Sequence, residues 1–194
     1  WYLWVYPYVS YADRNINAWY EADEFERFSY GFDVEHRNFF GLKHSIKLTF
    51  ISGYNQNYGA TYDWPDNIKK YNRGLKSGVA YKRDKEIAYA TINNKISYFN
   101  GDDVFAKQTG YLFIEPYYRF GHRNKLFLNF SYSDTYFHDS LSCLNPDFDK
   151  HFQYFSLMMT FKNDYRDEQN YPLKGHYLEI MMEKNGLGCF ETSP

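Results

Sequence analysis

Three acidic residues, Asp164, Asp167 and Glu168, lie closely spaced in the sequence and have the right chemistry for a divalent cation. Hard cations prefer oxygen ligands, and carboxylates are the most common of these in proteins. The same three residues stand in a polar stretch punctuated by proline and glycine, where carboxylates are ordinarily solvated parts of a turn. We therefore interpret them as turn residues and predict neither a bound metal nor another cofactor.

The second candidate for chemistry is a serine and a histidine on one predicted strand, Ser156 and His151, which could form the Ser/His pair of a barrel phospholipase. The motifs of common enzyme sites are otherwise missing from the sequence: it has no His-Glu-x-x-His, no Gly-x-Ser-x-Gly and no phosphate-binding loop. Its two cysteines, Cys143 and Cys189, lack metal-site spacing. We predict no enzymatic activity and two unpaired thiols, with a disulfide between them as the alternative.

Strand-like alternation surrounds these residues and extends along the whole chain. Apolar residues occupy every second position from 155 to 161 and from 178 to 182, on either side of a polar turn. A period of two places successive side chains on opposite faces of a sheet. The pattern recurs near 28–34, 46–50 and 126–132, and no segment keeps the 3.6-residue period of an amphipathic helix. The sequence therefore predicts an all-β fold.

Ten strands are expected, joined by connections of two kinds. Short turns containing glycine or proline lie at 38–43, 121–124 and 171–175 and near 64–67, whereas 12–26 and 137–150 are longer and polar. Short turns at one rim and long loops at the other are typical of outer-membrane barrels. The segment 82–100 does not follow this pattern of turns and loops. It is expected to be either an extension of one strand or an extra hairpin. The predicted strands are 2–11, 27–37, 44–54, 58–63, 75–81, 87–99, 108–119, 125–136, 151–162 and 176–183.

Composition favours a membrane barrel over a soluble β-sandwich. Of the 194 residues, 23% are aromatic and 24% charged, and the mean hydropathy is −0.70. Amphipathic rings suit the two lipid interfaces of a barrel, and strands of roughly 9 to 14 residues are long enough to cross a bilayer. The net charge of −2 gives no electrostatic basis for binding nucleic acid. We expect interfacial positions for several aromatic residues: Trp1, Trp4, Tyr6, Tyr8, Trp19 and Trp64.

Two prolines lie inside predicted strands, where each removes a donor from a hydrogen-bond ladder. We predict a β-bulge at Pro116. For Pro7 an edge or bulge competes with a weak seam, because the first strand of a barrel pairs with the last one and can be the place where the barrel opens.

Five motifs, spread in order over nearly the whole chain, resemble the barrel domain of the BamA/TamA superfamily, the bacterial surface antigen family, in its Bacteroidetes-type form. The resemblance covers the first half of that domain. The residues that carry it are Tyr11-Ala12-Asp13-Arg14-Asn15-Ile16-Asn17-Ala18-Trp19; Tyr30-Gly31-Phe32 leading to Asn38-Phe39-Phe40-Gly41; Lys85-Glu86-Ile87-Ala88-Tyr89-Ala90-Thr91; Leu144-Asn145-Pro146-Asp147-Phe148; and Arg166-Asp167 followed by Tyr171-Pro172-Leu173-Lys174-Gly175.

The resemblance implies an antiparallel, up-and-down transmembrane β-barrel in the bacterial outer membrane, of which this chain supplies about nine or ten of 16 strands. Periplasmic POTRA domains and the second half of the barrel would then lie outside this sequence, so the chain is expected to be a fragment of one barrel domain. The implied partners are unfolded outer-membrane protein substrates, outer-membrane lipids and periplasmic assembly partners that contact the POTRA domains.

The implied function is physical rather than enzymatic: outer-membrane proteins are inserted or exported through a weak lateral seam. An incoming strand would add to the edge of the first strand by β-augmentation. The alternatives are a dedicated exporter of surface proteins, a passive porin-like pore and a soluble β-sandwich that binds ligands. The seam residues in this chain would be Tyr2, Trp4, Tyr6, Pro7 and Tyr8, and the family-motif positions Asp13, Arg14, Asn15, Asn38, Gly41, Arg166, Asp167, Pro172 and Gly175. We interpret the last four chiefly as turn residues.

Overall fold

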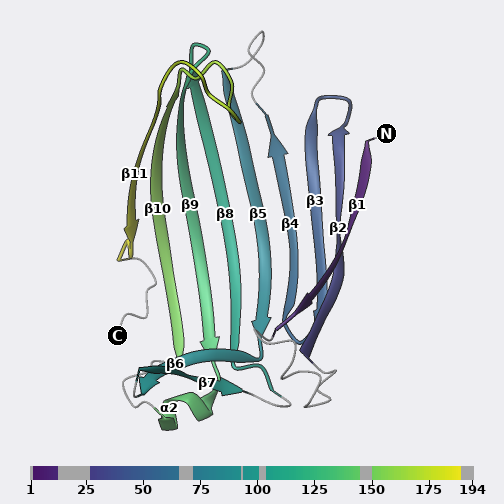
Figure 1. Ribbon diagram of the computed structural model, residues 1–194, viewed down its shortest axis with the longest axis vertical. Helices are drawn as coiled ribbons and strands as arrows, with labels where there is room; N and C mark the ends of the chain where they lie inside the picture. The colour runs from purple at the N-terminus through teal and green to yellow at the C-terminus, as the bar shows by residue number, and fades with distance from the viewer. Residues whose placement is uncertain are drawn as a thin grey trace.

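A nine-stranded antiparallel sheet dominates the computed structural model, which describes residues 2–12, 27–65, 72–92, 94–100, 104–144 and 150–188. Its strands follow one another in chain order, up and down (Figure 1). They are β1 (Leu3–Tyr11), β2 (Phe28–Phe39), β3 (His44–Gly53), β4 (Gln56–Trp64), β5 (Arg73–Asp84), β8 (Lys107–Phe120), β9 (Asn124–Phe137), β10 (His151–Asp164) and β11 (Tyr177–Asn185).

A small separate hairpin, β6 (Glu86–Ile92) and β7 (Lys95–Asn100), lies with the short helix α2 (Asp139–Leu144) at one end of the sheet. The hairpin replaces the single strand predicted over 87–99, and it is one of the two alternatives considered for that piece. Asn94 adopts a φ of 60° between its strands, a left-handed conformation that asparagine tolerates in tight turns. The connection from β5 to β8 therefore leaves the main sheet, and those two strands pair directly with each other.

Three of the predicted short turns lie at one end of the sheet, whereas 13–26, 66–67 and 145–149 lie outside the described residues. The turns β2–β3, β8–β9 and β10–β11 lie together at the end opposite the β6–β7 hairpin and α2 (Figure 1). The connection between β3 and β4 departs from this pattern, because it is short and yet lies at the hairpin end.

The predicted bulge at Pro116 is wrong. Ile114 of β8 pairs with Phe130 of β9, and Tyr117 pairs with Phe127, so the register is the same on both sides of the proline. The backbone N–H of Arg119 donates to Asn72 at 2.7 Å, which directs the odd-numbered backbone groups of β8 towards β5 and the even-numbered ones towards β9. Pro116 therefore removes one donor from the β8–β9 ladder without inserting an extra residue.

The strand register gives the sheet two faces of opposite character. On one face, Asp33 of β2 lies opposite Thr49 of β3, and Glu35 lies opposite Lys47. The other face carries an apolar row across six neighbouring strands, in which every member lies opposite the next. This row is Val5, Val34, Leu48, Ala60, Val79 and Leu112.

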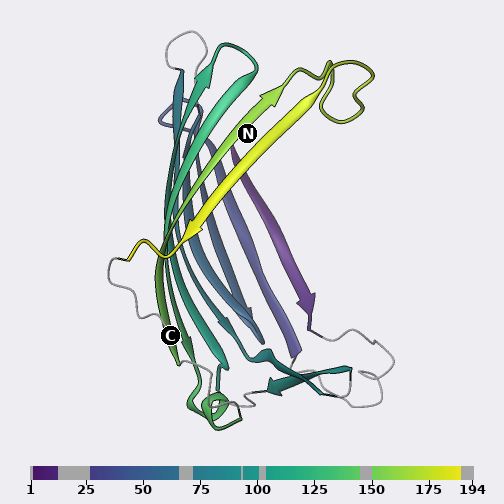
Figure 2. The same cartoon turned by 90° about the vertical axis from the view of Figure 1, so that its left-hand side faces the viewer.

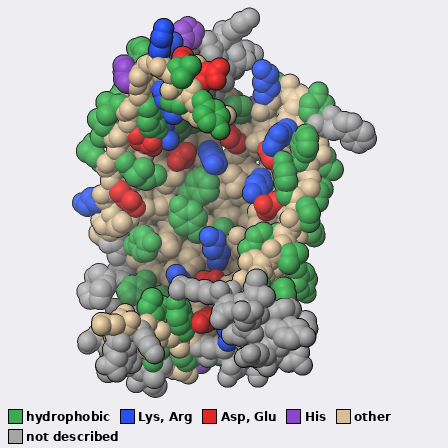
Figure 3. Space-filling view, viewed as in Figure 1, with side chains coloured by type: hydrophobic (Ala, Val, Ile, Leu, Met, Phe, Trp, Pro, Cys, Tyr) green, Lys and Arg blue, Asp and Glu red, His purple; other side chains and the backbone are tan. Residues whose placement is uncertain are grey.

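The sheet curves into a trough (Figure 2). Figure 3 looks into the hollow, where lysine, arginine and acidic side chains are spread across the surface, so the polar face is the concave one. The convex face leaves large apolar side chains exposed, among them Val79 at 53% and Leu112 at 54%. Among the described residues the only buried hydrophobic side chains are those of Tyr54, Ala106 and Leu141. No second described sheet covers either face, so the sandwich alternative finds no support in this part of the chain.

The trough does not close. Its outermost described strands are β1 and β11, which pair only with β2 and β10 respectively in the sheet order. None of the described helices is both long and apolar enough to cross a membrane.

Candidate functional site

The β1 edge is the first candidate site, and the backbone hydrogen bonds decide which of its groups face outward. Arg37 donates its N–H to the carbonyl of Tyr2 at 2.6 Å, and Ala12 donates to Arg27 at 3.2 Å. Even-numbered residues of β1 therefore make the ladder with β2, because hydrogen-bonded pairs alternate along an antiparallel ladder. The backbone groups of the odd-numbered residues, including Val5, Pro7 and Val9, are directed away from β2.

Pro7 thus lies on β1, an outermost strand among the described residues, and the donor that it lacks would have pointed outward. Its register partner Phe32 belongs to a pair that does not exchange backbone hydrogen bonds, so the β1–β2 ladder is intact across the proline. The gap in the row of donors lies instead on the outer side of β1, where a further strand would add. An added strand would find the carbonyl of Pro7 but no N–H.

Trp4, Tyr6 and Tyr8 share the concave face of β1, and Arg37 of β2 contacts the first two of them. Its guanidinium binds Glu35 through two hydrogen bonds, Nε–Oε1 at 2.8 Å and Nη2–Oε2 at 3.0 Å, and Nη2 also donates to the hydroxyl of Tyr6 at 3.2 Å. The same group lies 5.4 Å from the ring centroid of Trp4. Tyr2 and Trp4 line a pocket with Arg37, a residue that no motif of the sequence had singled out.

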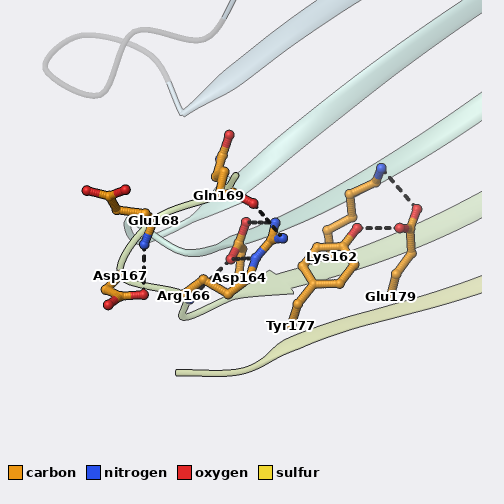
Figure 4. A network of polar contacts seen from close by, with 8 residues as sticks. All are labelled: Lys162, Asp164, Arg166, Asp167, Glu168, Gln169, Tyr177 and Glu179. Carbon is orange, nitrogen blue, oxygen red and sulfur yellow. Dashed lines mark hydrogen bonds and ion pairs between the residues drawn. The ribbon is translucent and has the colours of Figure 1, made fainter. Parts of the chain in front are cut away.

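A second cluster of predicted residues lies in the β10–β11 turn (Figure 4). Arg166 binds both carboxylate oxygens of Asp164, with Nε–Oδ1 at 2.9 Å and Nη2–Oδ2 at 2.8 Å, and lies 4.5 Å from the ring centroid of Tyr177. Its Nη1 also donates to the carbonyl of Gln169 at 3.2 Å. Hydrogen bonding to Arg166 lowers the pKa of Asp164 from 3.8 to about 2. The ion pair fixes the start of the turn.

Asp167 organises the middle of the same turn. Its Oδ1 accepts the backbone N–H groups of Glu168 at 2.9 Å, Leu173 at 3.1 Å and Lys174 at 3.2 Å. These bonds, that of Lys174 foremost, lower the pKa of the Asp167 carboxyl. One carboxylate oxygen thereby connects the two sides of the turn, which agrees with interpreting Arg166 and Asp167 as turn residues.

Gly175 closes the turn in a conformation that requires glycine. Its φ is 104°, and a Cβ atom there would lie 2.0 Å from the carbonyl oxygen of Tyr165. Pro172, by contrast, lies in a strongly exposed stretch whose neighbour Leu173 is 90% exposed. Gly175 therefore permits the backbone path of the turn, whereas Pro172 lies in its solvent-exposed part.

The β2–β3 turn places Asn38 and Gly41 together at the same end of the sheet. Asn38 Oδ1 accepts the N–H of Lys43 at 2.8 Å, and its carbonyl accepts the N–H of Gly41 at 3.0 Å. Asn38 and Gly41 have φ values of 69° and 72°, a conformation that asparagine and glycine adopt more readily than other residues. Asp13, Arg14 and Asn15 lie outside the described residues, as do Trp1, Trp19, most of the motif at 144–148 and Cys189.

The structure does not assemble the catalytic alternative. Ser156 Oγ lies on the concave face, 2.6 Å from Ser131 Oγ, whereas His151 Nε2 lies 2.6 Å from Asp134 Oδ1. Side chains separated by an odd number of positions along one strand point to opposite faces of the sheet. Ser156 and His151 are separated in this way, so they cannot act together. The suggested Ser/His pair is therefore wrong.

The suggested cation site also finds no support in the geometry. Among the described residues there is no group of three or more histidine, cysteine, aspartate or glutamate side chains that could hold a metal ion. Asp164 is engaged by Arg166, and Asp167 by backbone amides.

Comparison with known proteins found no matching family model, curated protein or solved structure.

Proposed function

We propose that this chain is part of an outer-membrane β-barrel that inserts or exports other membrane proteins by pairing the edge of β1 with an incoming strand. The observation that carries the proposal is a single two-faced sheet whose β1 edge directs backbone N–H and C=O groups away from β2. The apolar convex face, the polar concave face and the β1 edge are all present in one continuous nine-stranded sheet.

The convex face supports a lipid environment. Monomeric soluble proteins rarely expose a broad contiguous apolar surface, because exposed apolar area costs about 25 cal/mol per Å² in water. Here an apolar row lies in register from β1 to β8, and Val5, Val79 and Leu112 in that row are exposed. Lipid tails would cover such a face without a second layer of protein, and the concave face would enclose water.

Strand direction supports a larger barrel. Nine strands alternate in direction, so β1 and β11 run the same way and cannot pair with each other in an antiparallel manner. Single-chain bacterial barrels have an even number of antiparallel strands. Closure of this sheet would therefore need an odd number of further strands, and the 16 strands implied by the family resemblance would leave seven.

The edge of β1 supports strand capture. Leu3, Val5 and Val9 direct an N–H and a C=O group outward, and Pro7 directs only its C=O. Each unsatisfied backbone group costs several kcal/mol in a bilayer, so such an edge favours pairing with another strand. The donor missing at Pro7 makes every pairing there one hydrogen bond weaker, which suits a seam that must open again.

The test combines depletion with crosslinking in the native host. We expect depletion of the natural polypeptide that contains this sequence to lower the amounts of many unrelated outer-membrane barrels, measured by mass spectrometry. A cysteine replacing Val5 should form a disulfide with a cysteine in the terminal strand of a stalled substrate, whereas one replacing Ala60, in the centre of the sheet, should not. Loss of one surface protein would instead indicate a dedicated exporter. Unchanged protein levels together with ion conductance would indicate a passive pore.

A further inference from the structure

Three aromatic residues follow one another on the concave face of β1. Every second residue of this strand lies opposite a concave-face position of β2, and the aromatic ones among them are Trp4, Tyr6 and Tyr8, here called the aromatic row. Each member is 41% to 46% exposed. Because the row lies on the face opposite the proposed lipid contact, lipid does not account for its exposed rings.

The phase of the β1 ladder gives the aromatic row the closest approach to an added strand. Even-numbered residues of β1 exchange backbone hydrogen bonds with β2, as the N–H of Arg37 donating to Tyr2 at 2.6 Å shows. On the outer side of β1 the same residues would therefore form the pairs that do not exchange hydrogen bonds. The Cα atoms of such pairs lie about 4.5 Å apart, rather than about 5.5 Å, so their side chains approach most closely. An antiparallel strand added to β1 would thus place one side chain directly against each ring of the row.

Both carboxylates opposite the aromatic row are already neutralised. Asp33 binds Lys47 at 2.9 Å, and Glu35 binds Arg37 through two hydrogen bonds. The strand β1 itself, Leu3–Tyr11, contains no charged residue. The chemistry that the row offers to an added strand is therefore that of the rings, not that of a charge.

The rings differ in how much the rest of the sheet already uses them. Arg37 Nη2 donates to the hydroxyl of Tyr6 at 3.2 Å, and its guanidinium lies 5.4 Å from the ring centroid of Trp4. Side chains that are oriented before binding lose less entropy when a partner arrives. Tyr8 lies opposite Gly31, which has no side chain to pack against its ring. Tyr8 is therefore the member whose replacement disturbs the sheet least.

We propose that the aromatic row selects which strand pairs with β1. The favoured partner is an antiparallel strand with an aromatic residue at every second position, on the side that faces the concave hollow. Cross-strand pairs of aromatic side chains stabilise a sheet beyond the apolar area that they bury. The inference rests on the proposed capture of strands at β1, and it adds the side chains that a captured strand carries.

The test uses the natural polypeptide that contains this sequence, purified in detergent, with Val5→Cys and with its native cysteines replaced by serine. The probe is a nine-residue peptide that alternates valine and tyrosine, begins with valine and carries cysteine at its fifth position. A disulfide to Val5→Cys fixes the register, so that the tyrosine at the second position of the peptide lies opposite Tyr8. The equilibrium constant for thiol–disulfide exchange with glutathione then measures the pairing. Serine in place of that tyrosine should lower the constant about threefold.

Tyr8→Ser should lower the constant about threefold for the tyrosine peptide and leave it unchanged for the serine peptide, because that pair is then already lost. Tyr154→Ser is the matched control, since Tyr154 is 40% exposed on the concave face of β10, inside the sheet, and it should change neither constant. Equal constants for the two peptides, or equal weakening of both by Tyr8→Ser, would refute selection by the aromatic row while strand capture stands. If neither peptide is captured more strongly at Val5→Cys than at Ala60→Cys, strand capture itself fails, and the selection with it.

Discussion

Replacing Pro7 by alanine restores the donor missing from the outer side of β1. The change leaves the β1–β2 ladder untouched, because Pro7 and Phe32 do not exchange backbone hydrogen bonds. An added strand would gain one backbone hydrogen bond, worth about 1 kcal/mol net and more where lipid excludes water. A gain of about 1 to 2 kcal/mol corresponds to a roughly fivefold to thirtyfold longer lifetime of the paired state.

The assay follows release of a stalled substrate strand after disulfide capture at Val5→Cys is reversed by reduction. In the Pro7→Ala variant we expect the substrate to remain associated with β1 for longer, and substrate turnover to slow in proportion. Expression level and heat-modifiable gel mobility should match those of the parent protein, because the fold of the sheet does not depend on the outer edge.

Pro116→Ala provides the matched control for this variant. It also restores one strand donor and gives the unfolded chain the same extra freedom, but the restored N–H points to β9 inside the sheet. It should stabilise the β8–β9 ladder and leave substrate lifetime unchanged. Equal lifetimes for Pro7→Ala and the parent, or a similar increase for Pro116→Ala, would refute the assignment of the β1 edge as the pairing surface.

Three further predictions concern the turns and the anchoring of β1. Gly175→Ala should destabilise the β10–β11 hairpin by about 3 kcal/mol in denaturant unfolding, because it combines positive-φ strain with a clash against Tyr165, whereas Gly121→Ala, at φ 67° with open space around it, should cost about 1 kcal/mol. Folding lowers the pKa of Asp164 from 3.8 to about 2, so its contribution to stability is complete above pH 3.8 and is lost as the pH falls towards 2. The protection of the turn amides, measured relative to the intrinsic exchange rate at each pH, should fall over that range, and unchanged protection would contradict the ion pair. Arg37→Gln should increase amide exchange in β1 but not in β11. The same change in both strands, or no change in either, would show that Arg37 does not anchor the edge.

Local sequence was enough to predict the strands, because a period of two is imposed by the backbone of each strand alone. The strands predicted at 44–54 and 151–162 correspond to β3 and β10, which end within two residues of those bounds. The sequence also predicted the turn role of Arg166 and Asp167, since proline, glycine and short acidic side chains specify turns through local hydrogen bonds. It failed at 87–99, where a turn at Asn94 interrupts an otherwise continuous alternation.

Only the tertiary structure decided which side chains meet across strands. Register brings Arg119, Lys125 and Lys162 into one row, although the first and last are 43 positions apart in the sequence. The phase of the hydrogen-bond ladder likewise decides that the donor missing at Pro7 faces outward and the one missing at Pro116 faces β9. A shift of one residue would reverse either arrangement, and no local pattern in a single strand specifies the register of its neighbour. The sequence by itself therefore determined the two-faced strands, whereas pairing in three dimensions determined the edge and which charged side chains lie opposite each other.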